Sequence, residues 1–334
     1  MHRSQGNKLQ RILRVGRLAL LMVAIVSVAA AQQSSSPPGF TAWFCPMHPE
    51  VTAAEAGRCR KCGMALVAGD PFDTREYALD LSTAPTTVKA GGPITLFFTV
   101  RHPGTGALIT SFELVHEKPY HLFIVSRDME FFEHVHPAQQ PDGRWSMGVT
   151  LPKPGDYQML SDFLPTGGSP QFIGRTIETT GFDGDLESQT AHLVPDTVFT
   201  KTVGSLTAHL ELEPSVLVEG QYGHLMFTLS DAATGRPVTD LQPYLGAFGH
   251  ALILSEDMRD YVHSHPFEGP DSDISKGLGG PNVTFEGYMP RAGRYRAWSQ
   301  FQRNGEVITV PFTVNVSTLE EAFHNPGAPA VNLR

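Results

Sequence analysis

The sequence predicts a mainly β fold, in which a short cysteine-containing segment near the N-terminus precedes two tandem antiparallel β-sandwich domains. Three observations support this prediction. The chain contains 32 glycines and 26 prolines, which favour turns and short strands over long helices. Turn residues recur at intervals of roughly 8–12 residues, as in small sandwiches. The second half of the chain also repeats the first.

The duplication is visible as an ungapped match of residues 77–137 with residues 206–266. Equivalent residues are displaced by 129 positions (250−121). Farther on, the segment 151–157 matches 289–295 with a displacement of 138 (293−155), so the second copy is about nine residues longer. A period of this length indicates a duplicated domain rather than a short solenoid repeat.

Apolar runs bounded by turn residues mark the strands expected in the first copy. These runs cover residues 94–100, 121–126, 144–151 and 156–163. Helical periodicity is confined to a short turn expected at Leu319–Phe323. The resulting strand pattern resembles immunoglobulin-like or cupredoxin-like modules, and this resemblance concerns the fold alone.

The expected organisation has seven parts, which differ in composition and in their relation to the repeat. They are a signal peptide (1–31), a linker (32–41), the cysteine-containing domain (42–70), the first sandwich (75–182), a second linker (183–203), the second sandwich (204–317) and a C-terminal tail (318–334).

The N-terminus has the features of an export signal. Residues 1–17 carry five basic and no acidic side chains, and residues 18–30 form an apolar run. Ala29 and Ala31 place small residues at the positions that a signal peptidase requires. The run is short for a membrane span. We therefore expect cleavage near Ala31 and a periplasmic or secreted protein, which stays membrane-anchored only if the segment is retained.

The overall charge narrows the choice of partner. A formal net charge of −9 argues against nucleic acid, because binding to phosphates needs a basic surface. Beyond the N-terminal segment, no stretch is long and apolar enough to predict a membrane span.

All three cysteines lie within one short segment. Cys45 is followed at the third position by His48, and Cys59 is followed in the same way by Cys62. Two such pairs bring four ligands together, as in a zinc ribbon. Thiolates with an imidazole suit zinc or copper, and the thioethers of Met47 and Met64 favour a soft ion such as Cu(I). The alternative is a disulfide that leaves one cysteine free.

This segment resembles the heavy-metal-binding domain found on copper-transporting P-type ATPases and on adaptor proteins of heavy-metal efflux pumps. The resemblance covers about residues 42–70 and rests on Cys-Pro-Met-His-Pro at 45–49 and Cys-Gly-Met at 62–64, with Cys59 and Leu66 also matching. Phe44 and Arg60 depart from the residues common in the family, but neither change removes a ligand. The resemblance implies heavy-metal binding.

Each repeat also contains a histidine triplet with identical spacing. A histidine begins an apolar run, and a His-x-His-Pro motif follows thirteen residues later. Alternate residues of a strand share one face, so the paired histidines can contact one ion and the first histidine can supply a third ligand. We expect a zinc or copper site in each repeat. The ligands are His121, His134 and His136 in the first copy and His250, His263 and His265 in the second.

Other residues near the triplets are candidates for supporting roles in a metal site. Met129 and Met258 could be additional ligands, and Asp128 and Asp257 could orient a histidine. Alternatively, the Asp-Met pairs are turns and the triplets are structural residues copied with the domain. The remaining histidines have no counterpart in the other copy or no clustering, and we expect them in loops or at the surface: His102, His116, His192, His209, His224 and His324.

These observations predict an exported protein that binds copper or zinc and sequesters or relays it, with a component of an efflux system as a candidate partner. One alternative is an adaptor or adhesion protein whose metal is purely structural. A second is a metal-dependent oxidase or hydrolase. The acidic residues near the triplets, Glu133 and Asp162, are replaced by Val262 and Gln300 in the second copy, so we expect no enzymatic activity.

Overall fold

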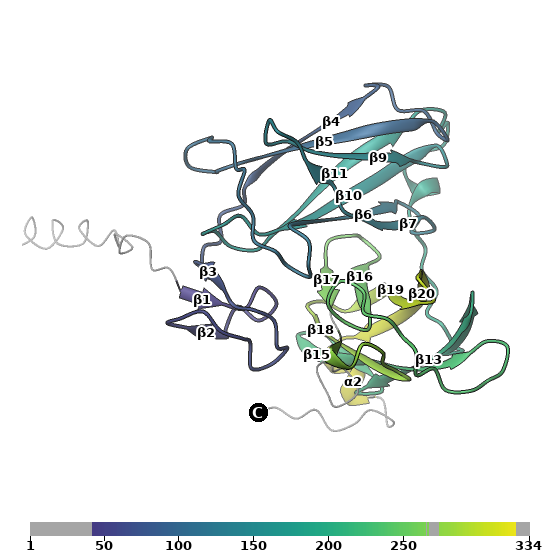
Figure 1. The fold of residues 1–334 in the computed structure, drawn as a ribbon. Helices are drawn as coiled ribbons and strands as arrows, with labels where there is room; N and C mark the ends of the chain where they lie inside the picture. The colour runs from purple at the N-terminus through teal and green to yellow at the C-terminus, as the bar shows by residue number, and fades with distance from the viewer. Residues whose placement is uncertain (1–41, 265, 267–273, 325–334) are drawn as a thin grey trace, which may run out of the picture. The chain divides into compact units, whose positions relative to one another are not determined.

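A computed structural model describes residues 42–264, 266 and 274–324 of the chain (Figure 1). The predicted signal peptide, the first linker and His265 lie outside the described residues. The described residues all belong to one compact unit, and they confirm the predicted class: a small N-terminal sheet followed by two β-sandwich repeats.

The N-terminal sheet is small and antiparallel. It has the order β2-β1-β3, with β1 at Ala42–Phe44, β2 at Thr52–Ala53 and β3 at Val67–Gly69. Two tight turns lie outside these strands: the His48 amide donates to the Cys45 carbonyl, and the Gly63 amide donates to the Cys59 carbonyl. Both Cys-x-x motifs therefore lie in turns that are held by backbone hydrogen bonds.

Repeat 1 packs two four-stranded antiparallel sheets against each other. One has the order β4-β5-β9-β8 and the other β11-β10-β6-β7. The bounds are β4 Ala78–Ala84, β5 Pro93–Arg101, β6 Tyr120–Ser126, β7 Phe132–Val135, β8 Ala138–Gln139, β9 Trp145–Thr150, β10 Gly155–Phe163 and β11 Gln171–Thr179. Their inward side chains, including Phe98, Tyr120 and Trp145, form a separate hydrophobic core.

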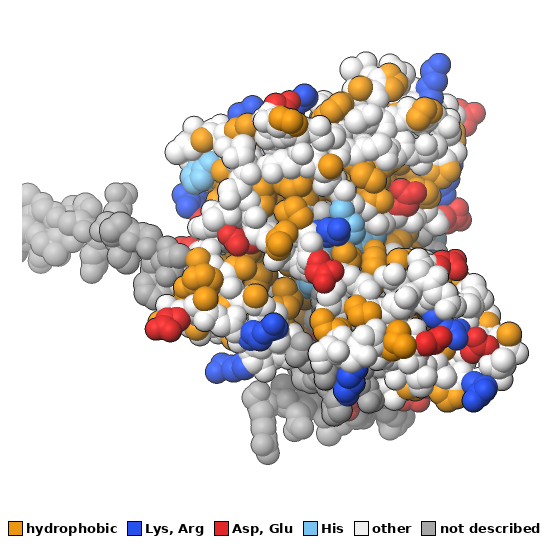
Figure 2. Space-filling model, in the orientation of Figure 1, with side chains coloured by type: hydrophobic (Ala, Val, Ile, Leu, Met, Phe, Trp, Pro, Cys, Tyr) orange, Lys and Arg blue, Asp and Glu red, His pale blue; other side chains and the backbone are white. Residues whose placement is uncertain are grey.

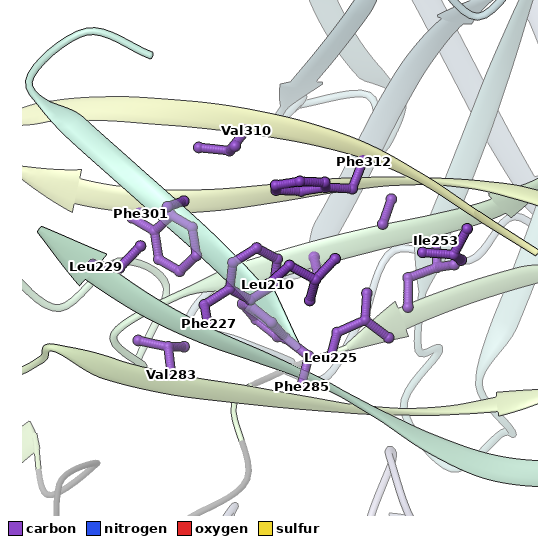
Figure 3. Packing of buried hydrophobic residues seen from close by; sticks show 14 of the residues in the cluster. Leu210, Leu225, Phe227, Leu229, Ile253, Val283, Phe285, Phe301, Val310 and Phe312 are labelled. Atoms are coloured by element: carbon purple, nitrogen blue, oxygen red, sulfur yellow. The ribbon is translucent and has the colours of Figure 1, made fainter. Parts of the chain in front are cut away.

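Repeat 2 also packs two sheets against each other, one of four strands and one of five, and most of its strands are longer than their counterparts in repeat 1. Its sheets have the orders β12-β13-β15-β18 and β14-β20-β19-β16-β17. Figure 3 shows Phe227, Phe285, Phe301 and Phe312 packed together in its core. The bounds are β12 Thr200–Val203, β13 Leu206–Glu213, β14 Leu217–Val218, β15 Gln221–Asp231, β16 His250–Ser255, β17 Tyr261–Ser264, β18 Asn282–Met289, β19 Gly293–Arg303 and β20 Glu306–Ser317.

Equivalent strands of the two repeats, β6 and β16, are buried on both faces. Along β6, Leu122 and Ile124 point into the core of repeat 1, whereas Phe123 and Val125 point the other way. In β16, Ile253 points into the core of repeat 2, and its neighbours Leu252 and Leu254 join Phe123 and Val125 in a third hydrophobic cluster. The two repeats therefore pack against each other through the outer faces of β6 and β16.

Aromatic side chains extend this inter-repeat cluster. Phe132 of β7 stacks on Trp298 of β19 with ring centroids 4.8 Å apart, and Tyr261 of β17 stacks on Phe172 of β11. Ala191 and Leu193, from the segment between the repeats, are buried in the same cluster. Buried aromatic area on this scale stabilises a fixed arrangement of the repeats.

The two Asp-Met pairs form turns rather than parts of a metal site. Met129 has φ 57° and Met258 φ 59°, in the left-handed region, and their amides donate to the carbonyls of Ser126 and Ser255. Both methionine side chains pack in the inter-repeat cluster. The structure therefore does not support thioether ligands at these positions. It supports the alternative that the Asp-Met pairs are turns.

Three short helical segments lie outside the sheets in the described part of the chain. The η1 turn, Glu187–Gln189, lies between the repeats, and η2, Ile274–Lys276, lies in the longer loop of repeat 2. The α2 helix, Leu319–His324, begins at the residue expected from the sequence. Among the described residues, no helix is long and apolar enough to cross a membrane.

Candidate metal centres

The first candidate centre joins Cys45, His48, Cys59 and Cys62. The Cys45 Sγ atom lies 3.6 Å from Cys62 Sγ and 3.7 Å from His48 Nδ1, and Cys59 Sγ lies 3.7 Å from the same nitrogen. A tetrahedral ion with Zn–S bonds of about 2.3 Å and Zn–N bonds of about 2.05 Å would separate its ligand atoms by about 3.6–3.8 Å. The four side chains therefore fit a tetrahedral ion.

Protons occupy this centre when no cation competes for the ligands. The hydrogen bond with Cys45, and then burial, raise the pKa of the Cys62 thiol to about 12. The hydrogen bond with Cys62 raises the pKa of His48 above its ordinary value. Since a metal binds thiolate and neutral imidazole, binding here must release protons.

The predicted thioether ligands lie beside this centre. Met47 and Met64 are partly buried against the hydrophobic cluster that contains Cys45, Cys59 and Leu66. Their position allows them to shield the cysteines from water, and the four Cys and His ligands complete a tetrahedron without them.

The second candidate centre lies between the repeats. It joins His121 of β6 and His134 of β7 to His250 of β16 and His263 of β17, and one nitrogen of each lies within 4.8 Å of the others. His121 Nδ1 is 3.1 Å from His134 Nε2, and the Nε2 atoms of His250 and His263 face each other in direct contact. Nitrogen ligands at about 2.05 Å from a tetrahedral ion would be about 3.3 Å apart.

This arrangement differs from the site expected in each repeat. The histidines extend from the outer faces of their sheets, on the same side as Phe123 and Leu252. Because these faces pack against each other, each repeat contributes two imidazoles to one shared cluster. We call it the four-histidine cluster.

The second nitrogen of three of these imidazoles is held by a hydrogen bond. His121 Nε2 donates to the Val115 carbonyl (2.9 Å), His134 Nδ1 to Gln300 Oε1 (2.8 Å) and His263 Nδ1 to Asp162 Oδ2 (2.7 Å). In a neutral imidazole the other nitrogen then carries a lone pair. Lone pairs are thus directed into the cluster, where they repel one another unless a cation lies between them.

The two acceptor side chains occupy equivalent positions in the two repeats. Asp162 of repeat 1 accepts from a histidine of repeat 2, and Gln300 of repeat 2 accepts from a histidine of repeat 1. Gln300 Nε2 also donates to Thr309 Oγ1, which fixes the orientation of its amide. The replacement of Asp162 by Gln300 in the second copy was an argument against a catalytic acid at this position. Instead, both residues accept a histidine N–H, which either side chain can do.

Burial disfavours the charged form of two imidazoles in the cluster. Burial, and then the proximity of His263, lower the pKa of His121 to about 3. Burial also lowers the pKa of His134 well below its ordinary value. Burial opposes ionisation of Asp162, but the hydrogen bonds from His263 and Tyr261, together with the nearby histidines, lower the pKa of the carboxyl. The neutral imidazoles of His121 and His134 are in the protonation state that a cation requires.

The remaining predicted ligands have different outcomes. His136 Nε2 lies 3.3 Å from His121 Nδ1, so His136 borders the cluster, and burial lowers its pKa to about 4. His265 lies outside the described residues. Asp128 and Asp257 accept from the serine hydroxyls of the Asp-Met turns instead of orienting a histidine.

One histidine expected in a loop or at the surface adjoins the cluster. His116 is buried, and its ring centroid is 4.8 Å from that of His263 and 5.1 Å from that of His250. Comparison of the two repeats gives no sign of this role, because the equivalent residue of repeat 2 is Leu245. Of the other histidines in that group, His192, for example, is exposed and lies 3.6 Å from Glu187.

The profiles of two known domain families match most of the chain. The profile of a domain of unknown function (DUF8832) matches residues 73–181 and again residues 201–318, so the chain belongs to this family. The profile of the heavy metal binding domain matches residues 42–68 and confirms the predicted resemblance of that segment. No curated protein matches the chain.

The solved structures that match the chain are distant from it in sequence and in structure. The Escherichia coli adhesin FdeC is 17% identical, with 76% of this chain and 68% of that chain covered and a TM-score of 0.23. The Yersinia pseudotuberculosis adhesin InvE is 12% identical, with 72% and 60% covered and a TM-score of 0.22. Domains 4 and 5 of the S-layer protein SbsC are 17% identical, with 72% and 99% covered and a TM-score of 0.19.

Proposed function

We propose that this chain is an exported protein that binds heavy-metal ions at two centres, the Cys/His centre and the four-histidine cluster, and sequesters or relays them. The observation that carries the proposal is the inward direction of the imidazole lone pairs, set by Val115, Gln300 and Asp162. Such hydrogen bonds orient metal-binding histidines and increase their basicity. The heavy metal binding domain match supports the first centre independently.

The ligand sets suit copper or zinc at both centres. Three thiolates and one imidazole favour Cu(I) or Zn(II), whereas four imidazoles favour Zn(II) or copper. Four protein ligands complete a tetrahedron and leave no open position for water or substrate. We therefore propose a binding role without catalysis, with the receiving partner in an efflux or storage system.

The surface is compatible with this role. In Figure 2, acidic and basic side chains are interspersed on the face shown, and apolar atoms lie between them. The net charge of −9 attracts cations weakly and disfavours nucleic acid.

The test is element analysis of the full-length protein after expression in medium that contains copper and zinc, followed by titration of the apoprotein with Cu(I), Cu(II) and Zn(II). We expect Cys59→Ser to lose binding at the first centre only and His134→Ala at the second only. If both variants bind as much copper and zinc as the parent, the proposal fails.

A second candidate function is an adaptor or adhesion protein whose metal is structural. The four-histidine cluster favours it in one respect, because an ion there would join the two repeats. The two functions differ in whether the bound metal ion exchanges with solution while the protein stays folded. A structural ion stays bound when a competing chelator is added under native conditions and leaves only on unfolding. A relayed ion exchanges while the fold is retained.

A further inference from the structure

A pocket of about 370 Å³ connects the surroundings of the two candidate centres. Met47, His48 and Cys62 line it from the Cys/His centre. His116, Asp162 and His263 line it from the four-histidine cluster. The pocket is much larger than a metal ion, and an ion can cross it without opening the hydrophobic cores.

Packing holds the N-terminal segment against this pocket. Phe44 and Val67 form a hydrophobic cluster with Val115 and Leu164 of repeat 1. Gly69 allows close approach here, since a Cβ at this position would lie 2.3 Å from the carbonyl oxygen of Gly168. The Cys/His centre is therefore fixed beside repeat 1.

The segment Val115–His116 contacts both the N-terminal segment and the four-histidine cluster. The Val115 side chain packs on Phe44, directly before Cys45, while its carbonyl accepts the N–H of His121 in the four-histidine cluster. The next residue, His116, places its ring next to those of His250 and His263. These two residues thus join the wall of the pocket to the buried cluster.

The histidine at position 116 is not required by the backbone. His116 has φ 50°, and the equivalent Leu245 of repeat 2 has φ 55°, so the two repeats share this left-handed turn. An apolar side chain is therefore compatible with the turn. Repeat 1, which lines the pocket here, has an imidazole instead.

We propose that His116 is a transfer ligand, through which a metal ion passes across this pocket between the Cys/His centre and the four-histidine cluster. This inference rests on the proposed function, because it requires both centres to bind metal. The step is a ligand exchange without redox change. The bonds from the ion to all four ligands of the Cys/His centre are replaced first by bonds to water. After the ion crosses the pocket, the His116 imidazole replaces a bound water, and each released thiolate takes a proton from water.

The test is a displacement experiment on the full-length protein with Co(II) as the probe. Co(II) is first bound at the Cys/His centre, where thiolate ligands give a near-ultraviolet charge-transfer band. An organomercurial such as p-hydroxymercuribenzoate, which binds thiolates covalently and releases their cobalt, is then added together with excess nitrilotriacetate. The chelator captures cobalt that enters solution, so cobalt retained on the protein with nitrogen-only visible bands has transferred internally.

We expect the parent to retain most of the displaced cobalt and His116→Leu to lose at least several-fold more to the chelator. The matched control is His192→Leu, which removes an exposed histidine and should behave as the parent. His116→Gln is the second variant if the leucine protein fails to fold. Equal retention by the parent and both His116 variants overturns the inference.

Direct loading separates this inference from the proposed function. His116→Leu should bind Co(II) in the four-histidine cluster with the affinity of the parent once equilibrium is reached, because its four ligands remain. A loss of that affinity would make His116 a permanent ligand and overturn the transfer role. If the parent binds no Co(II) in the cluster at all, the proposed function fails for this centre.

Discussion

The two candidate centres of this protein are encoded in different ways. The ligands of the Cys/His centre lie within residues 45–62, in two turns beside one small sheet. The ligands of the four-histidine cluster come from four strands in two repeats and meet only because the repeats pack together. The first centre is therefore a local property of the chain, and the second depends on tertiary structure.

The largest expected effect follows from removing a ligand of the local centre. Cys59→Ser replaces a thiolate by a hydroxyl, which is a poor ligand for a soft ion. We expect affinity at this centre to fall by at least about 100-fold, whereas the four-histidine cluster keeps its affinity. Competition titration with a Cu(I) chelator measures both. Equal losses at the two centres would show that they are one coupled site.

The next effect tests the dependence of the cluster on packing. Trp298→Ala removes a buried ring that stacks on Phe132, and we expect a loss of about 3–5 kcal/mol in the free energy of unfolding. Affinity for Zn(II) should fall at the four-histidine cluster and stay constant at the Cys/His centre. Urea unfolding and zinc titration provide the measurements.

Phe323→Ala is the control for this prediction, since it removes an exposed aromatic side chain. It should change neither stability nor zinc affinity appreciably. A Trp298→Ala protein that is destabilised but binds zinc at the cluster as tightly as the parent would contradict the dependence on repeat packing.

A smaller effect is expected from the hydrogen-bond acceptors behind the imidazoles. Asp162→Asn keeps an acceptor but removes the negative charge next to His263, and we expect about a 10-fold loss of affinity at the cluster. Gln300→Leu removes the acceptor of His134 and should cost about 10–100-fold. Isothermal titration with Zn(II) checks both. Unchanged affinities would mean that these bonds do not orient the ligands.

The last prediction concerns the pH dependence of stability. Burial lowers the pKa of His121 to about 3 in the folded apoprotein, whereas an unfolded histidine titrates near 6.5. The unfolded chain therefore binds more protons below pH 6.5, and stability falls as the pH decreases from about 6.5 towards 3.

The slope of that loss is at most about 1.4 kcal/mol per pH unit for each buried histidine. Urea unfolding of the apoprotein between pH 7 and pH 4 measures it. His121→Gln lacks the titrating group and should show a shallower slope. An identical slope in the variant would contradict the assigned protonation state.

Much of this structure is predictable from the sequence because its signals are local. The Cys-x-x-His and Cys-x-x-Cys spacings specify turns, and the strand pattern with its internal repeat specifies two sandwiches. The shared cluster is not predictable in this way, because the repeat pattern contains no information on how the two copies pack against each other.

One signal for the packing was nevertheless present. Residues 121–126 and 250–255 contain mainly apolar side chains at successive positions, whereas an antiparallel strand with one solvated face alternates apolar and polar residues. Both runs are buried on both faces, and their outer faces form the contact between the repeats. His116 lacked such a signal, because the equivalent residue of repeat 2 is Leu245 and its contacts with the cluster arise only from the packing of the repeats.

The most direct test of the account is the zinc content of three proteins in a Cys45→Ser/Cys59→Ser background, which removes the local centre. The first is the Cys45→Ser/Cys59→Ser protein itself, called the parent here. The other two add His134→Ala in repeat 1 or His263→Ala in repeat 2. One shared cluster predicts one zinc ion per chain in the parent and none in either variant. Two zinc ions in the parent and one in each variant would show a separate site in each repeat and contradict the account.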